Sequence, residues 1–247
     1  MKAYKTMLKT ELKLSLRGMD MLIFAVIMPI IVLVVIGIMY GNKAASDGAN
    51  YTFLEQSFGG IASIAICAGG VMGLPLVVSD YRSKQILKRF KVTPVKPIVI
   101  LLVQVTVYTL YALVSLISVF VVATLFFEYK VKGDILQFVL GWLLVMVSMF
   151  SIGMMVGGIS KNSKIAGIFA SALYFPMLIF SGATLPYEVM PPAMQKVVDI
   201  LPLTQGIKIL KSTTLGLPLE NIRLPIIIMI VFAAACSFVA IKFFKWE

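Results

Sequence analysis

Six long apolar runs constrain this chain more than any other feature. Their lengths are close to or above the roughly 20 residues that an α-helix needs to cross the hydrocarbon core of a bilayer. None contains Asp, Glu, Lys or Arg, and the chain of 247 residues has no His. The runs are 21–40, 58–78, 98–127, 135–159, 165–185 and 224–241. Because a segment in lipid must satisfy its own backbone hydrogen bonds, we predict six transmembrane helices and an all-α integral membrane protein.

The composition excludes several classes of protein. Hydrophobic residues make up 60% of the chain and charged residues 13%, which excludes an ordinary soluble domain. Metal or acid–base chemistry needs clusters of His, Cys or carboxylates, so we predict neither an enzyme nor a metal site. Cys67 and Cys236 lie inside apolar runs, where we expect them to pack as free thiols. Ion-coupled secondary transport needs ionisable groups at membrane depth, and the six runs contain none.

The distribution of charge predicts the orientation of the helices. With both ends of the chain inside, the cytoplasmic segments hold 15 of the 22 Lys and Arg residues and 4 of the 11 acids. The whole net charge of +11 then falls on one side of the membrane. Cytoplasmic loops carry an excess of Lys and Arg, so we expect both termini in the cytoplasm and no nucleic-acid partner.

Residues 1–20 show a four-residue repeat of apolar and basic positions. The apolar positions are Tyr4, Leu8, Leu12 and Leu16, and the basic positions are Lys5, Lys9, Lys13 and Arg17. This pattern predicts an amphipathic helix that lies in the headgroup region of the membrane. The same helix could also act as a lever that contacts a soluble partner.

A basic stretch, residues 79–97, separates the second and third apolar runs. Ser79 or Asp80 is expected to cap a short helix, which should end at Thr93 because the next residue is proline. Ile86, Leu87 and Phe90 share one face of this helix. We therefore predict a short amphipathic helix at the membrane surface. Its basic residues could reflect topology alone or bind a soluble partner.

The segment 182–223 carries two shorter apolar stripes between the fifth and sixth runs. Pro192 can occupy the first position of a helix, and Pro202 interrupts the pattern. The first stripe is Met194, Val197, Val198 and Leu201, and the second is Leu203, Ile207, Leu210 and Leu215. Both are too short to span a bilayer, so we predict re-entrant helices that dip into the outer leaflet or cover the protein.

Two motifs give the chain a specific resemblance. Leu87, Arg89, Thr93 and Pro94 match the loop after the second span in the type-2 permeases of ATP-binding-cassette (ABC) exporters. A second motif is similar to the C-terminal signature of the same permeases. It comprises Leu185-Pro186, Pro191, Gln195, Pro202-Leu203-Thr204 and Lys211. With six spans in the correct order, the chain resembles that family over essentially its whole length. It departs from the pattern at Lys211, at Gln205-Gly206 and in the short loop 41–57, and these departures leave the substrate class open.

The resemblance implies a single permease domain over residues 1–247 that is not itself an enzyme. The chain has no G-x-x-x-x-G-K-[ST] phosphate loop, so ATP and Mg²⁺ would bind a separate cytoplasmic ATPase subunit, present in two copies. A second permease subunit, identical or different, would complete a multi-pass complex in a bacterial plasma membrane. The implied activity is efflux of an amphipathic or hydrophobic substrate, such as a drug, antibiotic, peptide or lipid-like molecule, as in multidrug resistance. An ion-coupled transporter and a non-transporting immunity or sensor protein are the alternatives.

The resemblance also assigns candidate residues to three roles. Contact with the ATPase falls on Arg82, Leu87, Lys88, Arg89, Phe90, Thr93 and Pro94. The extracellular signature falls on Pro191, Gln195, Pro202 and Thr204. A substrate pathway between facing second and fifth spans falls on Phe169, Ser171, Tyr174, Phe175 and Phe180, around an expected helix break at Pro176. The small residues of the second span would let a partner subunit approach, although packing within the chain explains them equally well.

Overall fold

The protein is a helical bundle with six segments able to cross a membrane. The computed structural model describes residues 2–40, 43–45, 49–86, 97–184, 187 and 190–243, and these contain one isolated β-bridge and no strand. The candidate spans are Asp20–Tyr40, Phe53–Ser83, Ile98–Phe127, Ile135–Ile159, Ser163–Phe180 and Glu220–Phe243. The prediction of an all-α membrane protein with six spans is thus confirmed.

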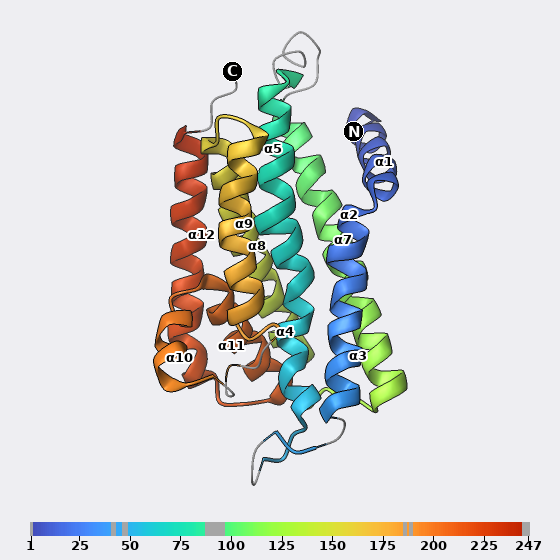
Figure 1. The fold of residues 1–247 in the computed structure, drawn as a ribbon, viewed down its shortest axis with the longest axis vertical. Helices are drawn as coiled ribbons and strands as arrows, with labels where there is room; N and C mark the ends of the chain where they lie inside the picture. Colours follow the sequence, from blue (N-terminus) through green and yellow to red (C-terminus); the bar gives the residue numbers. More distant parts are fainter. Residues whose placement is uncertain are drawn as a thin grey trace.

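The helices follow one another in the order of the apolar runs (Figure 1). They are α1 (Lys2–Gly18), α2 (Asp20–Leu22), η1 (Ile23–Ile27), α3 (Met28–Tyr40), α4 (Phe53–Cys67), η2 (Ala68–Gly73), α5 (Leu74–Ser83), α7 (Pro97–Phe127), α8 (Ile135–Ile159), α9 (Ser163–Phe180), α10 (Pro192–Val198), α11 (Pro202–Leu215), η4 (Leu219–Ile222) and α12 (Arg223–Phe243). The start of α1, the end of α5 and the end of α12 all lie at the upper end of the bundle in Figure 1.

The second span is longer than its apolar run. It begins at Phe53 because Thr52 and Glu55 form a capping box, and it continues through α4, η2 and α5 to Ser83. The helix therefore includes ionisable residues on both sides of its apolar run. Glu55 is in its first turn, and Asp80 and Arg82 are in its last turns.

Prolines shape the spans in two ways. The π-helical segments η1 and η2 come immediately before Pro29 and Pro75, where a proline ring removes a backbone donor and crowds the preceding turn. In the fifth span, by contrast, α9 continues through Pro176 to Phe180. The helix break expected at Pro176 is therefore wrong.

The re-entrant helix α11 packs inside the bundle. It lies against α4, α8 and α12, and its predicted stripe of Leu203, Ile207, Leu210 and Leu215 is buried (Figure 1). In α10 the predicted stripe is buried at Val198 and exposed at Val197, which is 66% exposed. Of the two predicted stripes, the one in α11 therefore becomes part of the core.

The N-terminal helix α1 is held against the third span by specific contacts. The Tyr4 hydroxyl lies 2.6 Å from the Thr106 hydroxyl, and Ser15 donates a hydrogen bond of 3.0 Å to the Tyr111 hydroxyl. The predicted apolar face packs on the bundle except at Leu16, which is 51% exposed. The helix is thus attached to protein as well as amphipathic.

The basic stretch begins differently from its prediction. Ser79 and Asp80 lie inside α5, so neither caps a new helix. The helix ends at Ser83, and Gln85 has a φ of 55°, which turns the backbone into the left-handed region. Residues 87–96, with the predicted coupling positions Leu87, Lys88, Arg89, Phe90, Thr93 and Pro94, are outside the described part of the chain.

Candidate functional site

Two adjoining cavities form a groove along the side of the bundle. Their volumes are about 380 Å³ and about 460 Å³, and they share the lining residues Ser15, Leu76, Val77 and Tyr108. The walls come from α1, α2, η1, the second span, α7 and α9. We call this pair of cavities the lateral groove. Each lies within the size range of small-molecule sites in proteins.

The cavity deeper in the bundle is mainly apolar and aromatic. Tyr108 and Tyr174 line it and are almost fully buried, and the Tyr174 hydroxyl has no hydrogen-bond partner within the described residues. Phe24 and Phe175 also line it and are each 48% exposed. Aromatic rings therefore form both the wall and the exposed edges of this cavity.

The other cavity, toward the end of α5, is polar. The Tyr81 hydroxyl donates a hydrogen bond of 2.6 Å to the Glu11 carboxylate, and Gln104 donates one of 3.0 Å to Tyr81. Asp80 forms an ion pair of 2.9 Å with Lys84 and lies 3.3 Å from the Ser163 hydroxyl, which donates to it. The lateral groove therefore has an apolar part and an acidic, hydrogen-bonding end.

Arg82 joins the second span to the fourth. Its guanidinium donates hydrogen bonds to the backbone carbonyls of Gly158 and Ser160, the latter at 3.1 Å. The last carbonyls of a helix lack partners within the helix, so this side chain satisfies the end of α8. The contact fixes the end of α5 to the end of α8.

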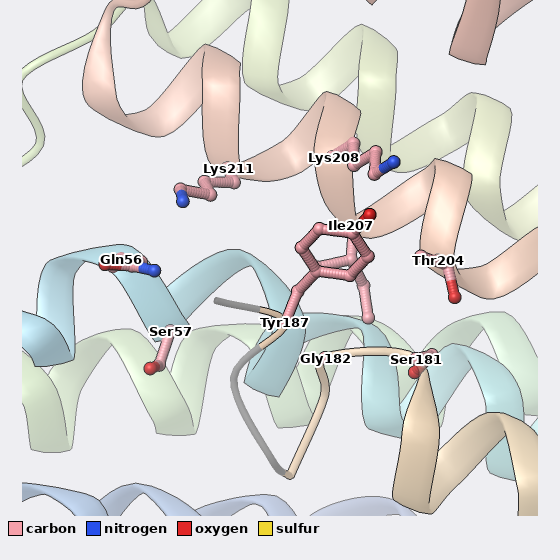
Figure 2. Close-up of a pocket in the computed structure, with 9 residues that line it drawn as sticks. All are labelled: Gln56, Ser57, Ser181, Gly182, Tyr187, Thr204, Ile207, Lys208 and Lys211. Atoms are coloured by element: carbon pink, nitrogen blue, oxygen red, sulfur yellow. The ribbon is translucent and has the colours of Figure 1, made fainter. Parts of the chain in front are cut away.

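The extracellular signature residues lie around α10 and the start of α11, and Thr204 among them lines a small polar pocket at the opposite end of the bundle. Pro191 precedes α10, Pro202 begins α11, and Gln195 donates hydrogen bonds of 3.2 and 3.1 Å to the carbonyls of Tyr187 and Met190. In Figure 2 the Tyr187 ring lies between the Ser181–Gly182 turn and α11, which contributes Thr204.

The volume of this pocket is about 40 Å³, enough for a water molecule and too small for a substrate. Lys208 and Tyr187 both bind Asp199, at 2.6 and 3.1 Å. Burial raises the pKa of the Tyr187 hydroxyl, Lys208 opposes the rise, and the hydrogen bond to Asp199 adds to it. The bond between Lys208 and Asp199 ties the end of α10 to α11.

Comparison with known proteins identifies the family. The model of the ABC-2 type transporter family matches residues 2–215. The chain belongs to this family. It is 28% identical over 94 residues to Nodulation protein J of Neorhizobium galegae and 31% identical over 94 residues to Nodulation protein J of Rhizobium meliloti (strain 1021). Each match covers 38% of this chain and 34% of the relative, so the chain spans about a third of the length of these curated relatives.

The resemblance predicted from the sequence is thus confirmed, and the chain is a multi-pass ABC-2 membrane component. Within this ABC-2 permease, two of the five predicted pathway residues, Tyr174 and Phe175, line the lateral groove. Ser171 lies beside it, with its hydroxyl 3.9 Å from the sulfur of Met72. Phe169 and Phe180 are 52% and 36% exposed and are not among the groove's lining residues.

Sequence reasoning missed the other half of the groove. Phe24, Tyr108 and Glu11 lie outside both family motifs, and the packing of η1, α7 and α1 brings them to the groove beside the second span. One signal was available for Glu11, which is an isolated acid among basic residues of an amphipathic helix. Arg82 was predicted to contact an ATPase; within the chain its guanidinium binds carbonyls at the end of α8, and the ATPase contact remains a prediction.

Proposed function

We propose that this chain is the membrane-spanning subunit of an ABC exporter that moves an amphipathic or hydrophobic substrate outward. A separate cytoplasmic ATPase, which holds ATP and Mg²⁺, supplies the energy. The observation that carries the proposal is the lateral groove in a chain of the ABC-2 family. The proposal includes the bacterial plasma membrane as its location and both termini in the cytoplasm, and the excess of Lys and Arg in the segments at that end supports this orientation.

The shape of the groove supports an amphipathic substrate. Its lining includes Ser163, at the start of α9, and Phe175, twelve residues further along the helix. At 1.5 Å per residue this separation is about 18 Å, the length of a drug-sized molecule or a lipid headgroup with part of its chain. The polar end near Glu11 and the aromatic part near Tyr174 match the two parts of such a molecule.

Coupling to the ATPase involves the stretch that follows α5. Leu87, Arg89 and Phe90 bind a groove of the ATPase, as the resemblance implies. Arg82 connects the last turn of α5 to the end of α8, so a displacement of this stretch is transmitted to both helices. The lateral groove has α5 as one of its walls and therefore changes shape with that displacement.

A second permease subunit completes the complex. The second span buries 83% of its most apolar eighteen residues within this chain, whereas the fifth span buries 28%. The exposed apolar face of α9, with Ile168 and Phe169, is therefore the more suitable contact for a partner. Cysteines at Phe169 should cross-link between two copies, while cysteines at Ser63, which is fully buried, should not.

The decisive experiment is purification of the tagged chain with its ATPase. We expect a protein with a phosphate loop to co-purify, and its ATP hydrolysis to rise in the presence of substrate. The test pair is Arg89→Glu, in the predicted coupling stretch, and Lys130→Glu, the same reversal of charge at the opposite end of the bundle. Only Arg89→Glu should release the ATPase.

The proposal fails if no ATPase associates with the intact chain, or if both charge reversals leave assembly and transport unchanged. Leu87→Asp is a second variant at the same contact. Burying one large apolar side chain contributes roughly 1.5–3 kcal/mol, so this change should weaken binding of the ATPase by about tenfold or more.

A further inference from the structure

The charged side chains that line the lateral groove are acidic, whereas the chain as a whole carries a net charge of +11. The segments at the same end of the bundle contain 15 Lys and Arg residues and only four acids in the sequence. Three of those acids line the groove, and no Lys or Arg lines it among the described residues. They are Glu11, Asp20 and Asp80.

Two of these acids have no basic partner. Within the described residues, neither Glu11 nor Asp20 has a Lys or Arg nitrogen within 4.0 Å. Asp80 is paired with Lys84, which is 65% exposed. The groove therefore keeps negative charge from Glu11, within α1, and from Asp20, the first residue of the first span. Beside an apolar wall this charge acts through a lower dielectric than in water.

The aromatic part of the groove suits a cation as well. Tyr108, Tyr174, Phe24 and Phe175 present aromatic rings, whose faces attract cations. The Tyr174 side chain is 2% exposed, and its hydroxyl has no partner within the described part of the chain. A buried hydroxyl that lacks a partner costs free energy, and the oxygen can be satisfied by a positively charged group in the cavity.

We infer that the substrate of this permease is a lipophilic cation, held in the lateral groove between Glu11 and Asp20, with its apolar body against the aromatic rings of the cavity that Asp20 also lines. The inference rests on the proposed function and names the substrate class of the same site. The unpaired carboxylates would repel an anionic amphiphile of the same size. They would add no charge–charge attraction to the binding of a neutral one.

The test is a binding measurement with two ions of matched shape. The full chain is placed in lipid nanodiscs, and binding of tetraphenylphosphonium and of tetraphenylborate is measured against empty discs. The cation should bind saturably, and at least about tenfold more tightly than the anion. The double variant Glu11→Gln and Asp20→Asn should weaken binding of the cation by about tenfold, because it removes both unpaired charges. Glu11→Gln keeps an oxygen that can accept the hydrogen bond from Tyr81.

Glu128→Gln is the matched control, because it removes one exposed carboxylate at the opposite end of the bundle. It should leave affinity for the cation within about twofold. The inference is overturned if the chain binds no cation saturably, if the anion binds as tightly as the cation, or if the double variant binds the cation like the control.

Asp20→Asn alone serves as a second variant. Asp20 is exposed, so its substitution should not disturb folding, and it should weaken binding of the cation by about threefold. The measurement does not involve ATP, so absence of an ATPase partner would defeat the proposed function and leave this result standing.

Discussion

The second and fifth spans lie against each other, but the second is mostly buried within the chain and the fifth is mostly exposed at its surface. The second span runs from Phe53 to Ser83 and has 83% of its most apolar eighteen residues buried within the chain. The fifth span runs from Ser163 to Phe180 and has 28% buried. One helix is thus the centre around which the others pack, and the other faces outward along much of its length.

Side-chain size explains this difference. Lipid tails are as apolar as leucine, so helices in a membrane associate through close packing rather than through the hydrophobic effect. Glycines of the second span meet α11, the Gly182 turn and α8, at Gly59, Gly60 and Gly70. The fifth span instead presents Ile168, Phe169 and Phe175 at its surface.

The lateral groove lies where these two kinds of helix meet. Its firm wall is the second span, which is held at its start by Glu55 and at its end by Arg82. Its aromatic edge is the fifth span. We expect changes in the second span to affect stability and changes in the fifth span to affect substrate binding, and four predictions test this division.

The largest effect is expected where α8 crosses the second span. A Cβ atom at Gly153 would overlap the carbonyl oxygen of Gly70, which is backbone and cannot move aside. Gly153→Ala should lower the free energy of unfolding by about 3 kcal/mol or more, and the Tm by about 6 °C or more. The matched control in the fifth span is Gly167→Ala, whose Cβ would lie 3.4 Å from a Leu76 methyl carbon. A similar loss of Tm for both variants would contradict the division.

The second prediction concerns the start of the second span. Glu55 is buried, accepts a hydrogen bond of 2.7 Å from the backbone of Thr52, and pairs with Lys132 at 2.8 Å. Glu55→Gln leaves the lysine without its counter-charge and should cost about 2 kcal/mol, or roughly 4–8 °C in Tm. Glu220→Gln is the control at an exposed acid. In a double-mutant cycle with Lys132→Gln, the losses of stability from the two substitutions should be coupled. Additive losses would show that the ion pair does not cause the destabilisation.

The third prediction concerns the end of the same span. Arg82→Gln removes charged donors from the carbonyls of Gly158 and Ser160 and should cost about 1–2 kcal/mol. Lys84→Gln removes only an exposed pair with Asp80 and should cost less than about 0.5 kcal/mol. Thermal unfolding of the two variants in one detergent compares them directly. Equal stability would show that the contact with α8 does not hold the span.

The smallest effect on stability, and the clearest effect on transport, is expected in the fifth span. Phe175→Ala removes a half-exposed ring from the groove and should weaken uptake of tetraphenylphosphonium into inside-out vesicles by about fivefold. Phe169→Ala removes a ring of similar exposure outside the groove and should change uptake by less than twofold. If Phe169→Ala weakened uptake more than Phe175→Ala, the substrate pathway would lie on the exposed face of the fifth span, between two subunits.

The sequence predicted the parts of the fold that depend on local chemistry. Apolar length identified all six spans, because a helix in lipid must satisfy its own backbone. Spacing identified α11, whose predicted stripe is buried. Boundaries were less well predicted: the second span starts at a capping box, Thr52 and Glu55, which the sequence contains and the prediction missed, while the partners of Arg82 at the end of α8 appear only in the tertiary structure.

The candidate site was predicted only where a motif or an aromatic cluster marked it. Tyr174 and Phe175 were found in this way, while Phe169 and Phe180 share the same pattern and lie outside the groove. Periodicity predicts which face of its own helix a side chain occupies. It does not predict which neighbouring helix that face contacts.

The sequence by itself determined that the chain crosses a membrane six times and belongs with the ABC-2 permeases, because apolar length and short motifs are local properties. Only the tertiary structure decided which residues form the groove. Glu11, Asp20, Tyr108 and Tyr174 come from four separate elements that pack around the second span, and Gly69 and Gly73 of that span let Tyr108 of α7 approach it closely.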